Sequence, residues 1–198
     1  MTDMLETRPS LLLRIRDARD SRSWDQFVEL YTPLLYRFAL KQGLQNADAE
    51  DITQEVLTAV SHAIGRLEYD PQQGKFRSWL FTIARNKIAN QRLKRKTHPA
   101  GSGDSGMHAA LQNHPAPTSE EEALWEREYE QRLFQWAAEQ VRALFQPETW
   151  QAFWSTAVED QPVAQVAQKL GISVGAVYIA KSRVLARMKD KIQELGDR

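Results

Sequence analysis

Apolar residues recur three and four positions apart along most of this chain, and no convincing run alternates apolar with polar residues as a strand would. This spacing predicts a helix over 24–42, in which Pro33 should mark a break or kink. A second helix should begin near Asn46 or Asp48 as its N-cap, and a third should follow over 76–96. The chain is therefore predicted to be all-α.

Residues 97–119 interrupt this pattern, because they hold three Gly and three Pro and no apolar period. An unstructured loop of about 20 residues inside one compact domain is unusual. We therefore predict two small helical domains, 1–96 and 120–198, joined by a flexible linker over 97–119. Ser119 is expected to cap the acidic helix that opens the second domain.

Residues 163–182, VAQVAQKLGISVGAVYIAKS, fit the helix-turn-helix pattern. Ala167 is the small residue where two helices cross, Gly171 supplies a left-handed turn, and Ser173 is placed to cap the second helix. A hairpin buried for structural reasons alone is the alternative. In the helix-turn-helix interpretation the groove-facing residues are Ser173, Val174, Tyr178 and Ile179, and the phosphate-binding residues are Lys181, Arg183 and Arg187.

Residues 74–96 form the most basic part of the chain, with eight Lys or Arg and no acid. The aromatic residues Phe76, Trp79 and Phe81 stand at its start. Flat rings beside cations suit unstacked bases better than a duplex, although a helix with a solvated basic face would show the same charge.

Net charge over the whole chain is zero, since 26 basic residues balance 26 acidic ones. The charge is nevertheless segregated. Residues 120–130 carry six Glu against one Arg, and residues 169–191 carry six basic side chains against Asp190 alone. This arrangement indicates two binding surfaces with an acidic segment between them.

A stripe of acids, Asp48, Asp51 and Glu55, shares one face of the second helix with Gln54. Three interpretations compete: solvated surface, a metal site, or a docking site for a basic partner. No His accompanies the acids and their spacing is no known ligand signature, which argues against a metal site. The residues alone favour solvated surface, the usual role of charges on a helix.

Several functional classes find no support in the sequence. There is no cysteine, and none of the four His has metal-ligand spacing. No Gly-rich phosphate loop, nucleophile elbow or convincing carboxylate pair is found, so we expect neither catalysis nor a metal or other cofactor. The N-terminus does not resemble a signal peptide and no apolar stretch approaches a membrane span, which predicts a soluble, cytoplasmic protein without a membrane partner.

Three segments in this order resemble the sigma factors of bacterial RNA polymerase, in the small extracytoplasmic-function (ECF) group of the sigma-70 family. They are DAEDITQEVLTAV (48–60), FRSWLFTIARNKIANQRLKRK (76–96) and VAQVAQKLGISVGAVY (163–178). The resemblance covers about 24–96 and 124–192. It implies a sigma-2-like domain at 1–96 and a sigma-4-like domain at 120–198, with core RNA polymerase and promoter DNA as partners. It adds an anti-sigma protein to the candidate partners.

The resemblance also implies residue roles. The acidic helix would bind polymerase, which gives the stripe a basic partner and overrides the solvated-surface interpretation. The basic helix would hold the melted, single-stranded −10 element, and the helix-turn-helix would bind the −35 element as duplex. The polymerase-binding residues would be Asp48, Asp51, Gln54 and Glu55. The −10 residues would be Phe76, Trp79, Arg85, Asn86, Asn90, Arg92 and Lys96, with the two Asn reading bases from an exposed face.

In the helix-turn-helix the chain departs from the common pattern of the family. Many relatives have a Lys-Ser-Arg-like run after the helix-turn-helix turn, where this chain has Tyr178, Ile179 and Ala180. A stand-alone helix-turn-helix regulator is the main alternative function, and a nuclease is a third. The regulator explains 163–191 but assigns no role to the acidic stripe or the aromatic-headed basic helix, and the nuclease would require metal-dependent cleavage by the protein alone, which we do not expect.

Overall fold

The computed structural model describes residues 11–17, 19–66, 76–97 and 116–195, and within these ranges all regular structure is helical. The predicted all-α class is confirmed. The elements are α1 (Leu11–Arg14), α2 (Ser21–Lys41), α3 (Asn46–Ala63), the 3-10 turn η1 (Ile64–Arg66), α4 (Phe76–Thr97), α6 (Ser119–Arg142), α7 (Pro147–Ala157), α8 (Val163–Leu170) and α9 (Val174–Leu195).

The chain forms two compact units that divide inside α6, between Arg132 and Leu133. The N-terminal unit holds α1 to α4 and the first half of α6, and the C-terminal unit holds the second half of α6 with α7, α8 and α9. The sequence predicted domains of 1–96 and 120–198 joined by a linker at 97–119. Residues 98–115 of that linker lie outside the described residues.

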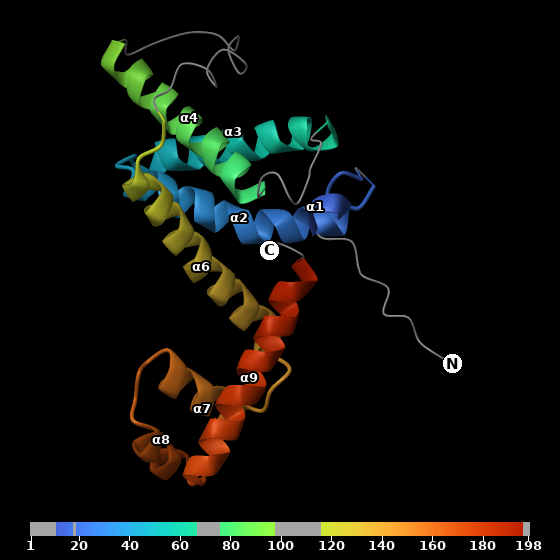
Figure 1. Ribbon diagram of the computed structural model, residues 1–198, viewed down its shortest axis with the longest axis vertical. Coiled ribbons are helices and arrows are strands. Elements are labelled where there is room, and N and C mark those ends of the chain that lie inside the picture. The colour runs from blue at the N-terminus through green and yellow to red at the C-terminus, as the bar shows by residue number, and fades with distance from the viewer. Residues whose placement is uncertain (1–10, 18, 67–75, 98–115, 196–198) are drawn as a thin grey trace. The chain divides into compact units, whose positions relative to one another are not determined.

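In the N-terminal unit α3 packs against both α2 and α4, as Figure 1 shows. The inner face of α4 carries Leu80, Ala84 and Ile88, all buried, as its apolar spacing predicted. From α2, Phe27, Leu34 and Phe38 complete this core, and the unit is held mainly by burial of these large apolar side chains.

Helix α2 runs without interruption through Pro33, so the predicted break is not found. A proline has no amide hydrogen, and the carbonyl four residues before it therefore lacks its helical donor. That carbonyl belongs to Glu29, and it accepts a hydrogen bond from Nη2 of Arg132 in α6 at 3.0 Å. A side chain from another helix thus satisfies a backbone group that the proline leaves open.

The helix starts follow the capping rules only in part. Helix α3 begins at Asn46 as expected, but its N-cap residue is Gln45, which makes no side-chain cap bond. Helix α6 begins with a capping box in which Thr118 and Glu121 bond reciprocally: the Glu121 amide donates to Thr118 Oγ1 (3.2 Å) and the Thr118 amide donates to Glu121 Oε2 (3.1 Å). The expected cap at Ser119 therefore lies one residue earlier.

In the C-terminal unit, α7 and α8 both pack against α9. Small and branched side chains fill the space where these helices meet. The buried cluster consists of Ala152, Val166, Ala167, Val177 and Ala180, with Val163, Leu170 and Ile172 packed against it.

Candidate nucleic-acid interface

The aromatic head of α4 is mostly core. Phe76 is 1% exposed and meets the rings of Phe27 and Tyr31 edge-on, each at 5.8 Å between centroids. The predicted use of Phe76 against a base is therefore corrected, because its ring is already covered on the inner side of α4. Phe81 is buried as well, while Trp79 is half-buried with its ring 5.4 Å from that of Phe76.

Asn86 and Asn90 occupy different surroundings although they are one helical turn apart on α4. Asn86 is 7% exposed, and its Nδ2 finds no hydrogen-bond partner among the described residues. Asn90 is partly exposed. The expectation that both amides lie on an exposed face is wrong for Asn86.

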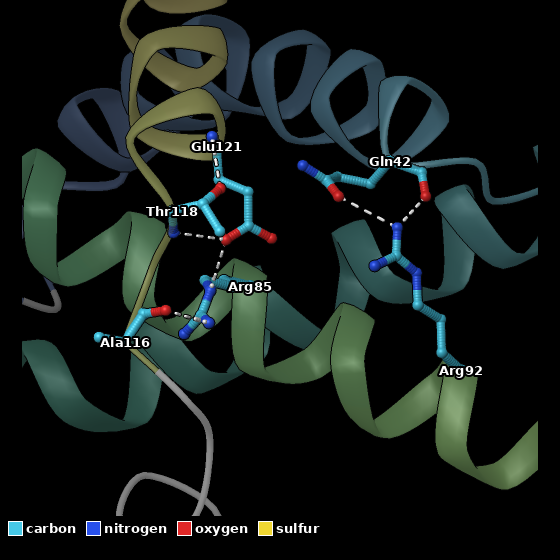
Figure 2. Close-up of polar contacts among 6 residues, drawn as sticks. All are labelled: Gln42, Arg85, Arg92, Ala116, Thr118 and Glu121. Atoms are coloured by element: carbon cyan, nitrogen blue, oxygen red, sulfur yellow. Dashed lines mark hydrogen bonds and ion pairs between the residues drawn. The ribbon is translucent and has the colours of Figure 1, made fainter.

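The cations of α4 contact oxygen atoms of the chain itself (Figure 2). Arg85 donates from Nε to Glu121 Oε2 at 3.1 Å and from Nη2 to the carbonyl of Ala116 at 3.2 Å. Arg92 donates from Nη2 to the backbone carbonyl and to Oε1 of Gln42, at the end of α2. Lys96 lies in the last turn of α4, and its side chain is outside the described residues.

Between these two arginines lies an open pocket of about 180 Å³. Its lining combines apolar side chains with both arginines, one glutamine and one glutamate. The lining residues are Phe38, Gln42, Arg85, Ile88, Ala89, Arg92 and Glu121. Such a combination suits a flat apolar group attached to an anion.

The acidic stripe on α3 divides into two parts. Asp48 is only 9% exposed, and its Oδ1 accepts a hydrogen bond from Gln91 Nε2 of α4 at 3.0 Å, so it holds α3 to α4 and is not open for docking. Asp51, Gln54 and Glu55 are exposed. Glu55 pairs with Lys87 of α4 at 2.9 Å.

Helices α8 and α9 have the geometry expected of a helix-turn-helix. They meet at an angle of 102°, and Gly171 between them adopts the left-handed conformation with φ 66°. Ser173 Oγ accepts a hydrogen bond from the Ala176 amide at 3.1 Å, which confirms the predicted cap of α9.

The first two turns of α9 expose an apolar surface. Val174, Tyr178 and Ile179 are 45%, 58% and 53% exposed, and the capping residue Ser173 is also exposed. Basic residues follow: Lys181 is half-buried, Arg183 is exposed, and Arg187 lies 3.7 Å from Asp190. The groove-facing and phosphate-facing residues predicted from the sequence are thus all at the surface or partly so.

Sequence reasoning missed the partners that hold the candidate residues. Glu121, Gln91 and Gln42 were not singled out, yet they bond Arg85, Asp48 and Arg92 respectively. One signal was available, because Thr118 and Glu121 have the spacing of a capping box. The contact between Glu121 and Arg85 joins residues 36 positions apart and has no local pattern.

Metal and membrane features are scarce in the described part of the chain. It contains no group of three or more His, Asp or Glu side chains placed to hold a metal ion. No single helix in it is long and apolar enough for a membrane span. Helices α8 and α9 pass that test only as a pair, and their sharp bend is that of the helix-turn-helix.

Comparison with known proteins identifies the family. Residues 27–98 match the family model described as Sigma-70 region 2. Over 170 aligned residues the chain is 32% identical to the ECF RNA polymerase sigma factor SigL of Mycobacterium tuberculosis. The aligned residues make up 84% of this chain and 86% of SigL. The chain therefore belongs to the ECF sigma factors of the sigma-70 family, which act in transcription initiation by RNA polymerase.

Two further matches have different coverage. The ECF RNA polymerase sigma factor RpoE of Cereibacter sphaeroides is 31% identical over 91 residues, which span 46% of this chain and 49% of RpoE, about half of that protein. The solved structure of CnrH in complex with the cytosolic domain of CnrY is similar over 92% of this chain and 95% of that one, with 19% identity and a TM-score of 0.36.

Proposed function

We propose that this protein binds core RNA polymerase, recognises the −10 and −35 promoter elements, and stabilises the melted −10 strand so that transcription starts there. The observation that carries the proposal is the helix-turn-helix with an open first face on α9, in a chain that also carries the basic helix α4. The mechanism is non-catalytic. It needs no cofactor, and it places the protein in the cytoplasm with the polymerase.

The −10 strand is assigned to the outer side of α4. Arg85, Arg92 and Lys96 bind its phosphates, Asn90 reads a base edge, and the half-buried ring of Trp79 lies beside the strand. Unstacking a base costs a few kcal/mol, and stacking and phosphate contacts offset this at roughly 1–3 kcal/mol per stacked base. Asn86 supports this face from within and does not read a base itself.

The polymerase surface is assigned to the exposed part of the acidic stripe. Asp51, Gln54 and Glu55 point away from the buried face of α3, so a basic partner surface can approach them without disturbing the core. Asp48 contributes by fixing α3 against α4 through Gln91. An anti-sigma protein is a further partner, which would compete for these same surfaces.

The −35 element is assigned to α9. Ser173, Val174, Tyr178 and Ile179 face the major groove, as the N-terminal residues of a recognition helix do, while Lys181, Arg183 and Arg187 bind phosphates. These phosphate contacts give affinity that depends on salt, whereas the contacts to base edges give sequence preference.

The decisive experiment mixes the purified protein with core polymerase and genomic DNA and sequences the 5′ ends of the transcripts. We expect discrete start sites preceded at constant spacing by two short shared elements. Absence of co-elution with polymerase, together with duplex binding by the protein alone, would instead support the stand-alone helix-turn-helix regulator.

A further inference from the structure

The first half of α6 lies against the face of α4 to which the −10 strand was assigned. Among the described side chains, salt bridges join Arg85 to Glu121 and Arg77 to Glu126, both at 3.1 Å. The Arg77 guanidinium also lies over the ring of Tyr129, 4.5 Å from its centroid. Acids of α6 thus neutralise basic side chains of α4.

Arg85 is bound as a nucleotide phosphate would bind it. Its Nε and Nη2 groups donate to two oxygen atoms, Glu121 Oε2 and the carbonyl of Ala116, which come from one short stretch of chain (Figure 2). A guanidinium can present the same pair of donors to two oxygen atoms of one phosphate group. While Nε and Nη2 of Arg85 hold Glu121 and Ala116, they cannot also hold a phosphate, so the strand and the 116–121 segment are alternative partners of this arginine.

Aromatic packing anchors the acidic segment in this position. Trp125 is buried, with its ring 5.2 Å from that of Phe38 in α2 and 5.7 Å from that of Phe81 in α4. Glu121 and Trp125 are four residues apart, so they share the face of α6 that meets α4. The packing of Trp125 therefore keeps the Glu121 carboxylate beside Arg85.

We propose that residues 116–132 are an intramolecular competitor of the −10 strand, with Glu121 occupying the phosphate site on Arg85 until polymerase or DNA displaces it. This proposal rests on the proposed function, since it takes α4 to be the strand-binding helix. It predicts that the free chain binds single strands weakly, because one of the cations assigned to the −10 strand, Arg85, is already paired with a carboxylate.

The test compares two neutralising substitutions in the full-length chain, Glu121→Gln and Glu122→Gln. Both remove one negative charge from adjacent positions, but Glu122 is exposed and no described contact joins it to α4. Glutamine preserves the capping box, because a Gln at this position can also accept the Thr118 amide. The probe is a fluorescent single-stranded deoxyoligonucleotide of about ten nucleotides, within the usual site size.

We expect Glu121→Gln to tighten binding about threefold to tenfold relative to Glu122→Gln, as for loss of one partly buried charge pair. The dependence of binding on salt should steepen by about 0.7 in log–log slope, the value for one additional phosphate contact on a single strand. Adding Arg85→Ala to Glu121→Gln should remove both effects. Hydrogen exchange should also be faster in residues 119–132 of Glu121→Gln, with α2 and α3 unchanged.

Equal strand binding by the two variants, including equally undetectable binding, would overturn the proposed competition. The proposed function is judged separately by wild-type transcription with core polymerase. A wild-type protein that directs initiation while Glu121→Gln matches Glu122→Gln would leave the sigma function standing and remove only the competitor.

Discussion

Asn86 and Asn90 show how one helical turn changes what an amide can do. The Asn86 side chain lies inside the N-terminal unit, where its Nδ2 has no hydrogen-bond partner among the described residues, whereas Asn90 reaches the surface of α4. Both were equivalent in sequence, because each is an Asn in the polar part of a basic amphipathic helix. The burial of each side chain in the folded unit, and not the sequence, distinguishes Asn90, which can read a base, from Asn86, which supports the helix from within.

This difference predicts that Asn90→Ala lowers −10 selectivity by about 1–3 kcal/mol, the usual contribution of a base-reading amide pair. Asn86→Ala should change selectivity less and affect mainly the stability of the N-terminal unit. Competition between promoter variants in transcription with core polymerase measures selectivity, and thermal unfolding measures stability. A larger loss of selectivity for Asn86→Ala would place that amide, and not Asn90, against a base.

Among the elements, α2 offers a titratable cap. Asp20 accepts hydrogen bonds from the Ser23 hydroxyl and amide and lies 3.2 Å from Arg14 Nε. These donors, Ser23 first, hold the pKa of Asp20 below its ordinary value of 3.8. The folded state therefore binds the proton more weakly than the unfolded state, and the cap stabilises the fold fully above the unfolded pKa.

As pH falls through the folded pKa of Asp20, that stabilisation is lost. We therefore predict that wild type loses more thermal stability than Asp20→Asn between about pH 5 and about pH 2, since asparagine caps a helix without titrating. The measurement is the difference in Tm between the two proteins across this range. Parallel curves would show that Asp20 contributes no pH dependence.

Helix α9 exposes apolar side chains on its first two turns, among them Val174, Tyr178 and Ile179. Apolar side chains in the major groove contact the C5-methyl group of thymine. We predict that replacing thymidine with deoxyuridine in the −35 duplex weakens wild-type binding about fourfold for each methyl group that is contacted. This factor corresponds to the free energy of about 0.8 kcal/mol gained by burying one carbon.

The variant Ile179→Ala should reduce this sensitivity to uracil, whereas Arg183→Ala should weaken binding to both duplexes equally, because it removes a phosphate contact. Titration of each variant with the two duplexes at one salt concentration separates these effects. Identical wild-type affinity for thymine and uracil duplexes would exclude methyl readout by this face.

The elements differ in how far local sequence determines them. The helix-turn-helix was predictable residue by residue, because Gly171, Ser173 and Ala167 each satisfy a local steric or capping requirement. The uninterrupted helix through Pro33 was not predictable from local sequence. The carbonyl that Pro33 leaves open accepts a hydrogen bond from Arg132, 103 positions away from Glu29. The prediction that Phe76 contacts the −10 strand was wrong for a similar reason. Helical periodicity identifies the buried face of a helix, but it does not show how far the first turn enters the core.

At the scale of the whole molecule, zero net charge conceals surfaces of opposite sign on separate helices. Basic side chains lie on α4 and α9, and the exposed acids Asp51 and Glu55 lie on α3. No overall field attracts the free chain to nucleic acid, so binding depends on each local surface. The polymerase contact and the DNA contacts should therefore respond to different substitutions.

We predict that the double substitution Asp51→Lys with Glu55→Lys weakens affinity for core polymerase at least about tenfold, since like charges at an interface cost several kcal/mol. Both residues lie off the buried face of α3 and lysine is a good helix former, so the helical circular dichroism should not change. Asp25→Lys, at an exposed acid on α2, is the control and should bind polymerase as wild type does. Duplex binding by the helix-turn-helix should be equal in all three proteins.

If the double variant kept full affinity for polymerase, the exposed acids of α3 would be solvated surface, as the residues alone first indicated.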